Sequence, residues 1–486
     1  MSNAQKTMDM KTMKYLFVAA LTMGFSATVM AQDGSKADVD AVKKIISSKP
    51  ADLDKQMKPF YKANKKNAEN LVAFGRAFYE AKDTANARVY ANYALTASKN
   101  NCAPAFIILG DIAVMSDEGG IAAQQYEQAI NVDPKNPDAY YKYALVYRKV
   151  DPRGVAQKMD QLKALRPDIQ TDAIMGHMYT IQNKDAEAYE FFSKVPMEKM
   201  NKGYLSEFAR SCFFSGHHAD GVRACDFAVQ QFPRNATFNR LGMMCCVEAK
   251  QYEKALQYAD RFFNASDSIE KFYNHEYFYP ALAYKALKQH DKAIEHFHKA
   301  LSLKGEGNLA SEESILSELS NAYQAKGDFD NAAKYLKSVH DKKEKLQIKD
   351  YETLANLYIE QGDSAKDEAA KEQAYMKADA VYADLEGKFA DNKAYFLYRR
   401  ASIGNKIDPE LAKGTAKPHY EALIELLEPK TDKDASDNQI LLIAYYYKMS
   451  FSLHKENDVA KAKDFAAKIL AINPEHKQAK AVSELK

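Results

Sequence analysis

The stretch that decides the fold is residues 110–134, which read GDIAVMSDEGGIAAQQYEQAINVDP. It places small residues at Gly110, Ala122 and Ala129, a spacing of 12 and then 7, and it ends on Pro134. Small residues at these intervals let two antiparallel helices approach closely, with the first on one helix and the other two on one face of the next. The proline ends the second helix because it has no backbone N–H to donate. The stretch therefore predicts a helical hairpin.

The same spacing recurs along the chain. It appears at Gly75, Ala87 and Ala94, at Ala209, Gly221, Ala228 and Pro233, and at Ala281, Ala293 and Ala300. The first small residue returns about every 34 positions, at Gly75, Gly110, Ala144, Gly176 and Ala209. A period of this length is typical of helix-turn-helix units that stack into an array, in which each unit is stabilised by its neighbours.

Several of these units resemble one known family. The segment ALAYKALKQHDKA at 281–293, followed by Phe297 and Ala300, is similar to a tetratricopeptide repeat. So is NAYQAKGDFDNA at 321–332, and YEQAINVDP at 126–134 resembles the usual end of such a repeat. The resemblance covers roughly residues 68–486 and is to exported, Bacteroidota-like bacterial members. It implies an all-α fold, a right-handed α-solenoid of about ten to eleven helix-turn-helix repeats.

The repeats are regular in the first part of the chain and longer in the last part. Ala355 and Ser450 are 95 residues apart, too many for two ordinary units, and extra residues lie near 264–275 and 304–313. Longer helices or longer loops would accommodate them. We expect a signal peptide at 1–31, an N-terminal helical cap at 32–67, a regular array at 68–340, and a C-terminal array of longer, divergent repeats at 341–486.

The N-terminus carries an export signal. Lys11 and Lys14 precede an apolar run from Tyr15 to Val29, and small residues at 29 and 31 suit a signal peptidase. The run is about 15 residues, shorter than the roughly 20 that a membrane span needs. No cysteine follows it, which argues against a lipoprotein. We expect cleavage near Ala31 and a mature chain without a transmembrane segment, in the periplasm or at the cell surface.

Composition and motifs argue against nucleic-acid binding, catalysis and metal binding. The formal net charge is only +2, close to neutral, and does not resemble the basic footprint of a nucleic-acid-binding protein. The sequence holds no CxxC, HExxH, EF-hand loop, phosphate-binding glycine loop or GxSxG element. We therefore expect no enzyme activity, no cofactor and no metal site.

The five cysteines leave at least one thiol unpaired. Cys212 and Cys225 are 13 residues apart, at inward positions on the two helices of one repeat. In an oxidising compartment they could form a disulfide; the alternative is two small buried side chains.

Three short Asp-Ser/Thr-apolar segments resemble the O-glycosylation acceptor of exported Bacteroidota proteins. Their hydroxyl residues are Thr84, Ser268 and Ser364, each at an expected turn or loop. A glycan would be accessible there.

The resemblance also implies a binding groove on the concave face, lined by the first helix of each repeat. Positions one after the first small residue, three before it, or one turn further on project into this groove. On this chain they are Arg76, Tyr79, Arg148, His177, Arg210, Phe213, Arg240, Phe278, Lys285, Asn321, Gln324 and Asn356, with Asp111, Phe214, Met244 and Tyr395 on the same faces. Arginine side chains can donate two hydrogen bonds to a carboxylate or a carbonyl, amides can pair with a peptide backbone, and aromatic rings can bind apolar side chains. Together these groups are typical of a site for an extended peptide.

The sequence thus predicts an exported, non-enzymatic scaffold that binds peptide or protein segments in its groove and supports protein–protein interaction in the cell envelope. The alternative is a carbohydrate- or nutrient-binding component of an outer-membrane uptake system. The 31 tyrosines favour sugar stacking, whereas the absence of tryptophan and of a lipoprotein cysteine weighs against it. The identity of the partner and the oligomeric state are left open.

Overall fold

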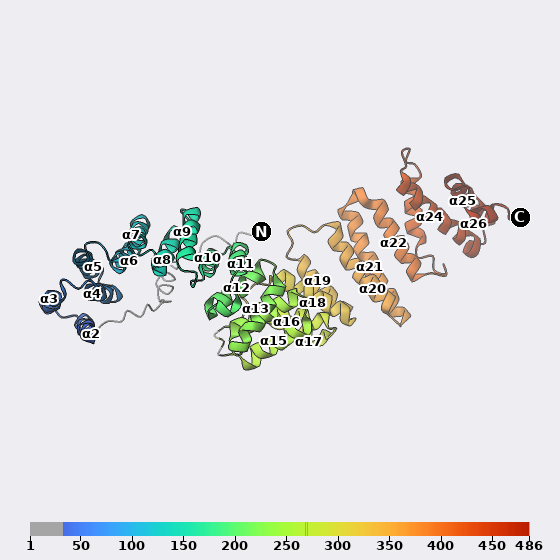
Figure 1. The fold of residues 1–486 in the computed structure, drawn as a ribbon. Coiled ribbons are helices and arrows are strands. Elements are labelled where there is room, and N and C mark those ends of the chain that lie inside the picture. Colours follow the sequence, from blue (N-terminus) through green and yellow to red (C-terminus); the bar gives the residue numbers. More distant parts are fainter. Residues whose placement is uncertain (1–32, 268, 270, 486) are drawn as a thin grey trace. The chain divides into compact units, whose positions relative to one another are not determined.

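The computed structural model describes residues 33–267, 269 and 271–485. The predicted signal peptide lies outside these residues. Within them the chain forms α-helices joined by short connections and contains no strand (Figure 1). Short 3₁₀ helices occur at Met197–Lys199 and Ala390–Asn392, and a π-helix at Ser452–Glu456. The helices belong to two compact units, unit 1 (Met1–Gln231) and unit 2 (Phe232–Lys486).

Unit 1 holds six helix pairs among its described residues, and consecutive pairs pack against each other. In each pair the first helix is here called A and the second B. The pairs are α2 (Asp33–Ser48) with α3 (Leu53–Asn64), α4 (Ala68–Glu80) with α5 (Thr84–Ser98), α6 (Ala103–Met115) with α7 (Gly119–Val132), α8 (Pro137–Tyr147) with α9 (Pro152–Leu165), α10 (Thr171–Thr180) with α11 (Asp185–Phe192), and α12 (Lys202–Phe214) with α13 (His218–Gln231).

Unit 2 continues the same organisation. Its pairs are α14 (Ala236–Glu248) with α15 (Tyr252–Ala265), α16 (His275–Ala286) with α17 (His290–Ser302), α18 (Glu312–Lys326) with α19 (Phe329–His340), α20 (Ile348–Ser364) with α21 (Glu368–Lys388), α22 (Lys393–Ile407) with α23 (Lys417–Leu427), and α24 (Ala435–Phe451) with α25 (Val459–Ile472), followed by α26 (Lys477–Ser483). From α4 to α25 the described residues hold eleven pairs, so the predicted all-α repeat fold and repeat number are confirmed.

The small residues lie where the two helices of a pair touch. A Cβ at Gly110 would lie less than 3.0 Å from three ring carbons of Tyr126, so only glycine lets α6 approach this ring. The ring is buried on the facing helix α7, between Ala122 and Ala129, which are both fully buried. The same glycine–aromatic contact recurs at Gly176 with Phe192 and at Gly242 with Tyr258. The 12-and-7 spacing thus encodes a close helix contact with an aromatic ring.

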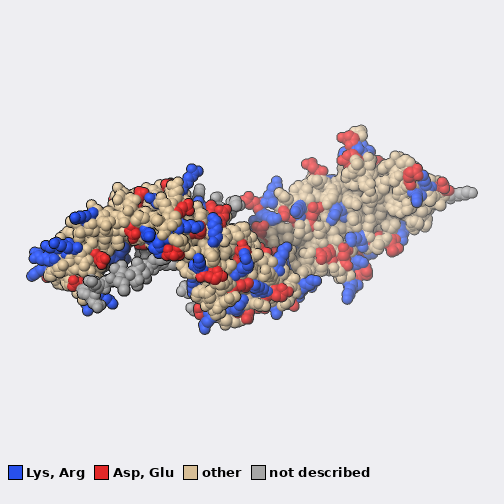
Figure 2. All heavy atoms as spheres, viewed as in Figure 1, with Lys and Arg blue, Asp and Glu red and all other residues tan. Residues whose placement is uncertain are grey.

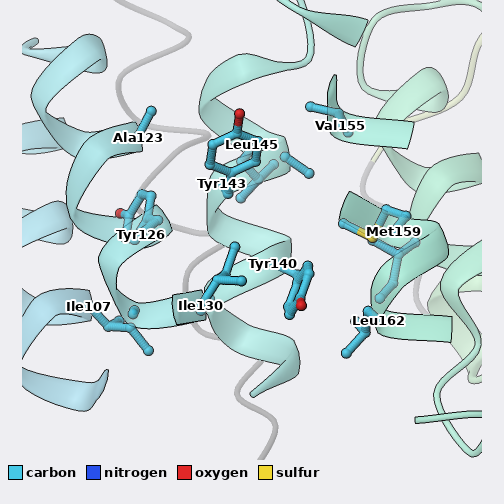
Figure 3. Close-up of a cluster of buried hydrophobic side chains, with 14 of the residues drawn as sticks. Ile107, Ala123, Tyr126, Ile130, Tyr140, Tyr143, Leu145, Val155, Met159 and Leu162 are labelled. Carbon is cyan, nitrogen blue, oxygen red and sulfur yellow. The ribbon is translucent and has the colours of Figure 1, made fainter. Parts of the chain in front are cut away.

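The core runs as a strip through each stack. Figure 3 shows one section, in which Tyr126 and Ile130 of α7, Tyr140 and Tyr143 of α8, and Met159 of α9 point toward one another. Tyr140 is 1% exposed, and it occupies the position where the resembled family has tryptophan. Large rings from one helix therefore fill the space that small residues leave on the next, as close packing requires.

The stretched C-terminal repeats result from both longer helices and a longer loop. Helices α20 and α21 have 17 and 21 residues, longer than any helix from α4 to α19. The connection from α22 to α23 is anchored by Asp408, whose carboxylate accepts hydrogen bonds from the backbone N–H groups of Ala412, Lys413 and Gly414. The boundary at 340 stays a prediction, and the division into compact units falls after Gln231.

The two smaller insertions of unit 2 contact each other. The Asn274 backbone N–H donates to Asn308 Oδ1 at 2.9 Å, and Asn274 Nδ2 donates to the Ala310 carbonyl at 2.6 Å. Gly307 has φ +92° and lies against the ring of Tyr273, so it suits this turn. The insertions that the sequence indicated are therefore an interlocked pair of loops.

Candidate functional site

The predicted groove residues lie on A helices, where an acidic residue of α6 forms a central contact. Asp111 is 1% exposed and accepts from Arg76 Nη1 of α4 at 2.7 Å. It also accepts from Tyr126 OH and from Lys142 Nζ of α8, each at 2.8 Å. We call these four residues the Asp111 hub. The hub joins three successive repeats through one buried carboxylate.

The electrostatics of the hub follow from its burial. Burial and then the charge of Asp111 raise the pKa of Tyr126 well above its ordinary value. The same two causes raise the pKa of Tyr79 to about 12. Burial also raises the pKa of Asp138, although Lys142 opposes this shift. The tyrosines therefore remain neutral hydrogen-bond donors at physiological pH.

A second contact set surrounds His177 of α10. Its Nε2 lies 3.2 Å from Tyr141 OH of α8, and its Nδ1 lies 2.9 Å from both carboxylate oxygens of Glu207 of α12. The ring of Tyr204 lies beside the imidazole, tilted by 55°, with 6.1 Å between ring centroids. His177 therefore connects A helices on both sides of its own repeat.

Arg210 of α12 reaches back to the preceding repeat. Its guanidinium donates to the Thr180 carbonyl at 3.4 Å and to Asn183 Oδ1 at 3.2 Å, and it lies 3.4 Å from Asp185 Oδ2. It also stacks over Phe214, with 5.5 Å to the ring centroid. Phe213 packs edge-on against the same ring at 5.1 Å. Arg210 thus holds the turn between α10 and α11 to α12.

Unit 2 repeats this pattern of contacts between A helices. Arg240 Nε of α14 lies 2.7 Å from Glu276 Oε1 of α16, a carboxylate that is fully buried. Burial raises the pKa of Glu276, although a backbone N–H and Arg240 oppose this shift. Three further contacts join α16, α18, α20 and α22 in succession. They are Lys285 with Glu318, Gln324 donating to Glu360 at 2.5 Å, and Asn356 accepting from Arg399 at 3.1 Å.

We call the polar contacts between neighbouring A helices the A-helix ladder. Its partners are about one repeat apart in sequence, separated by 30 to 36 residues and by 43 in the longer repeats. The pairs are Arg76–Asp111, Asp111–Lys142, Tyr141–His177 and His177–Glu207 in unit 1, and Arg240–Glu276, Lys285–Glu318, Gln324–Glu360 and Asn356–Arg399 in unit 2. Most predicted groove residues are therefore bound to a neighbouring repeat.

Three expected groove positions are wrong because their side chains are buried. Phe278 is 9% exposed and packs against Phe297 in the core of unit 2. Met244 and Asp111 are each 1% exposed. At these three positions the side chains point between helices, where packing excludes a ligand.

The other predicted positions remain at the surface. Arg76, Tyr79, Arg148, His177, Arg210, Phe213, Arg240, Lys285 and Gln324 are half-buried, whereas Asn321 and Asn356 are exposed. Phe214 and Tyr395 of the same face are 48% and 38% exposed. Aromatic rings and amides are therefore the groups that these helices offer to solvent.

Residue-by-residue inspection of the sequence missed the acidic partners. Glu207, Glu276, Glu318 and Glu360 were not singled out, although each lies one repeat after a residue that was. A search for a polar or basic residue followed by an acidic one at the repeat period would have found them. The repeat period thus carries electrostatic information as well as packing information.

The predicted modification sites stay predictions. Cys212 of α12 and Cys225 of α13 are both fully buried thiols on packed helices. Thr84 is the first residue of α5 and half-buried, and Ser364 is the last residue of α20 and exposed. Ser268 lies outside the described residues.

The described residues offer no group of three His, Cys, Asp or Glu side chains placed to hold a metal ion. Over the same part of the chain, no helix has the length and apolar character of a membrane span.

Comparison with known proteins identifies repeats of one family in two segments of the chain. Residues 122–150 match a TPR repeat model, and residues 281–306 match a tetratricopeptide repeat model. Among curated proteins, none matches this chain.

Two solved structures from Bacteroidota are similar. The C-terminal part of a TPR repeat-containing protein from Cytophaga hutchinsonii has 19% identity and a TM-score of 0.37, covering 58% of this chain and 100% of its own. A tetratricopeptide repeat protein from Parabacteroides merdae has 17% identity and a TM-score of 0.32, covering 52% and 98%.

The segment 281–306 contains the whole 12-and-7 spacing, and the segment 122–150 contains its last two small residues, Ala122 and Ala129. The described helices pair in the same way from α4 to α25. Stacked repeats of this kind create extended binding surfaces. The chain therefore contains tetratricopeptide repeats at residues 122–150 and 281–306.

Proposed function

We propose that this protein is a non-enzymatic scaffold that binds an extended peptide or protein segment along its A helices, in the cell envelope. The observation that carries the proposal is the A-helix ladder. It holds neighbouring A helices in register within each unit, so their side chains form a continuous row. An extended segment can then make many weak contacts, one repeat after another.

The ladder also indicates how a segment is recognised. Because Arg76, Arg210 and Arg240 are bound to acidic or carbonyl groups, the basic side chains are already engaged. Exposed rings such as Phe214 and amides such as Asn321 remain for the ligand. Rings supply apolar anchors, and amides pair with a peptide backbone. We therefore expect binding that depends on shape and depends only weakly on salt.

Site-specific photo-crosslinking tests the proposed face. A benzoylphenylalanine replaces Phe213 or Phe214 on α12 in the protein expressed in its own cells, and the matched control carries it at Val89, a 40% exposed position on B helix α5. We expect discrete protein adducts from the α12 positions and none from α5. Equal adducts from both faces, or adducts from α5 alone, would contradict the proposal.

A double variant measures the contribution of the face. Phe213→Ala with Phe214→Ala should reduce capture of the crosslinked partner at least about tenfold, because both rings are expected anchors. The control, Val89→Ala with Tyr93→Ala, removes two exposed apolar side chains from α5 and should leave capture unchanged. Circular dichroism establishes that both variants retain their helices. A glycan array probes the uptake-system alternative: binding to oligosaccharides, with no protein adduct, would favour it.

Export is part of the proposal and rests on the basic and apolar pattern of the N-terminus. Protein expressed in its native host should lose its leader, and N-terminal sequencing should begin at Gln32. Recovery of the whole chain with residues 1–31 in the cytosolic fraction would contradict it.

A further inference from the structure

The first helix pair carries a concentration of positive charge that the scaffold function does not use. Between residues 43 and 66 the chain has eight lysines, two aspartates and no arginine, although its total formal charge is only +2. The following residues, 67–130, hold four cations against seven acidic groups. The positive charge is therefore local to the C-terminal end of α2 and to α3, because the first part of α2 holds Asp33, Asp38 and Asp40 against Lys36. The lysines are Lys43, Lys44, Lys49, Lys55, Lys58, Lys62, Lys65 and Lys66.

All eight lysines are exposed. Among the described residues none of them lies in an ion pair. Figure 2 shows their blue side chains gathered at the end of unit 1 where Figure 1 places α3. Elsewhere in the chain exposed lysines commonly pair with an acidic neighbour, as Lys299 does with Glu295 at 2.8 Å. The charge of this helix pair is thus directed to solvent.

The lysines of α3 share one face. Lys55, Lys58 and Lys62 are spaced by three and four residues, which places them in one row along a helix. Lys65 and Lys66 continue the row past the C-terminal end of the helix. The opposite face is buried, because α3 packs on α2 and α4. The helix therefore attaches to the array on one side and presents a lysine row on the other.

From this arrangement we infer that α2 and α3 dock the protein onto an anionic phospholipid surface. Clusters of four to eight lysines or arginines attract anionic bilayers, with about 1 kcal/mol gained for each side chain near the surface. A bilayer presents many phosphate groups in one plane, so several lysine ammonium groups in a row can each lie close to a phosphate. Specific recognition of nucleic acid uses arginine forks or aromatic stacking platforms instead. This pair has no arginine, and its rings Phe60 and Tyr61 are half-buried in the packing.

Vesicle co-sedimentation tests the inference with the chain from Gln32 onward, because the apolar run at 15–29 would itself enter vesicles. The vesicles contain phosphatidylcholine alone or with about one third phosphatidylglycerol, a composition that supplies the anionic surface. The wild type should sediment with the anionic vesicles only, and about 1 M salt should abolish binding because the Debye length falls to about 3 Å. Sedimentation with both vesicle types, or no sedimentation, would overturn the inference.

Charge-neutral variants locate the effect. Lys55→Gln, Lys58→Gln, Lys62→Gln and Lys66→Gln together should lower vesicle binding by at least about tenfold, since each lysine contributes roughly a factor of five at full contact. Exposed lysines of unit 2 make the matched control, which should bind as the wild type does. Its substitutions are Lys345→Gln, Lys349→Gln, Lys366→Gln and Lys393→Gln.

A charge-retaining variant separates charge from folding. Replacing the same four α3 lysines by arginine should preserve vesicle binding, and thermal melts should be alike for all variants. If the unit 2 control lost as much vesicle binding as the α3 variant, the net charge of the protein and not this helix pair would cause the binding. Tighter binding to a duplex DNA probe than to vesicles at equal phosphate concentration would assign the lysines to nucleic acid and overturn the lipid proposal.

Discussion

Removing the carboxylate of the Asp111 hub should destabilise three repeats together. In an Asp111→Ala variant the ammonium of Lys142, whose side chain is 9% exposed, would lose its counter-charge. Breaking a buried pair by removing one partner costs about 3–5 kcal/mol. The Tyr126 hydroxyl would lose its acceptor, which adds about 1–3 kcal/mol. Arg76 has a side chain 34% exposed to water, so its lost contact adds little.

These costs overlap because the groups share one site, and we expect a total of about 4 kcal/mol. Urea unfolding followed by tyrosine fluorescence suits the measurement, because the chain has 31 tyrosines and no tryptophan. Since repeat arrays open locally, amide hydrogen exchange should show the loss in α4, α6 and α8 and spare unit 2.

A double-mutant cycle with Lys142→Met tests the reasoning. If Asp111 and Lys142 form a buried pair, the double variant should be more stable than Asp111→Ala alone, because no uncompensated charge remains. Two results would refute the hub as a source of stability: a free energy of unfolding lowered by less than about 1 kcal/mol in Asp111→Ala, or a loss in the double variant that equals the sum of the two single losses.

Two further predictions concern packing and pH. Gly110→Ala should destabilise by about 1–3 kcal/mol, because its Cβ would overlap the Tyr126 ring. The control Gly120→Ala has no atom within 4 Å of its Cβ and should instead stabilise by about 0.5–1 kcal/mol in thermal melts, through helix propensity. Hydrogen bonds from two lysines lower the pKa of Glu456 in the π-helix to about 2. The contribution of Glu456 to the free energy of unfolding is therefore fully present above pH 4.5 and is lost as the pH falls toward 2. The difference in free energy of unfolding between the wild type and Glu456→Gln should narrow over that range. A difference that stays constant with pH would contradict the prediction.

The fold could be predicted from the sequence because the repeat spacing records the close approach of two helices. Gly110 and Ala122 must be small wherever two helices touch, so their positions appear directly in the sequence. The same reasoning located the lengthened C-terminal repeats, since added residues change the period. It indicated neither the division after Gln231 nor the interlocking of the two loops around Asn274, because both depend on contacts that no period records.

The candidate site was less predictable for a physical reason. The sequence gives the face on which a residue lies, but not whether a neighbouring repeat covers it. Phe278 and Met244 lie at positions that the resembled family directs into the groove, yet both are buried. Arg76 and Arg240 were identified as ligand contacts, whereas each is paired with a buried carboxylate. Their partners lie one repeat away, outside any local window.

The A-helix ladder also bears on how such a chain can change during evolution. Each contact is made by unlike groups on two different repeats, so every repeat fits only the neighbours it has. Loss of the repeat formed by α6 and α7 through unequal recombination would remove Asp111 and leave the cations Arg76 and Lys142 facing each other. Repeats that share a backbone spacing are therefore not interchangeable units, and their charges record the order in which they must be joined.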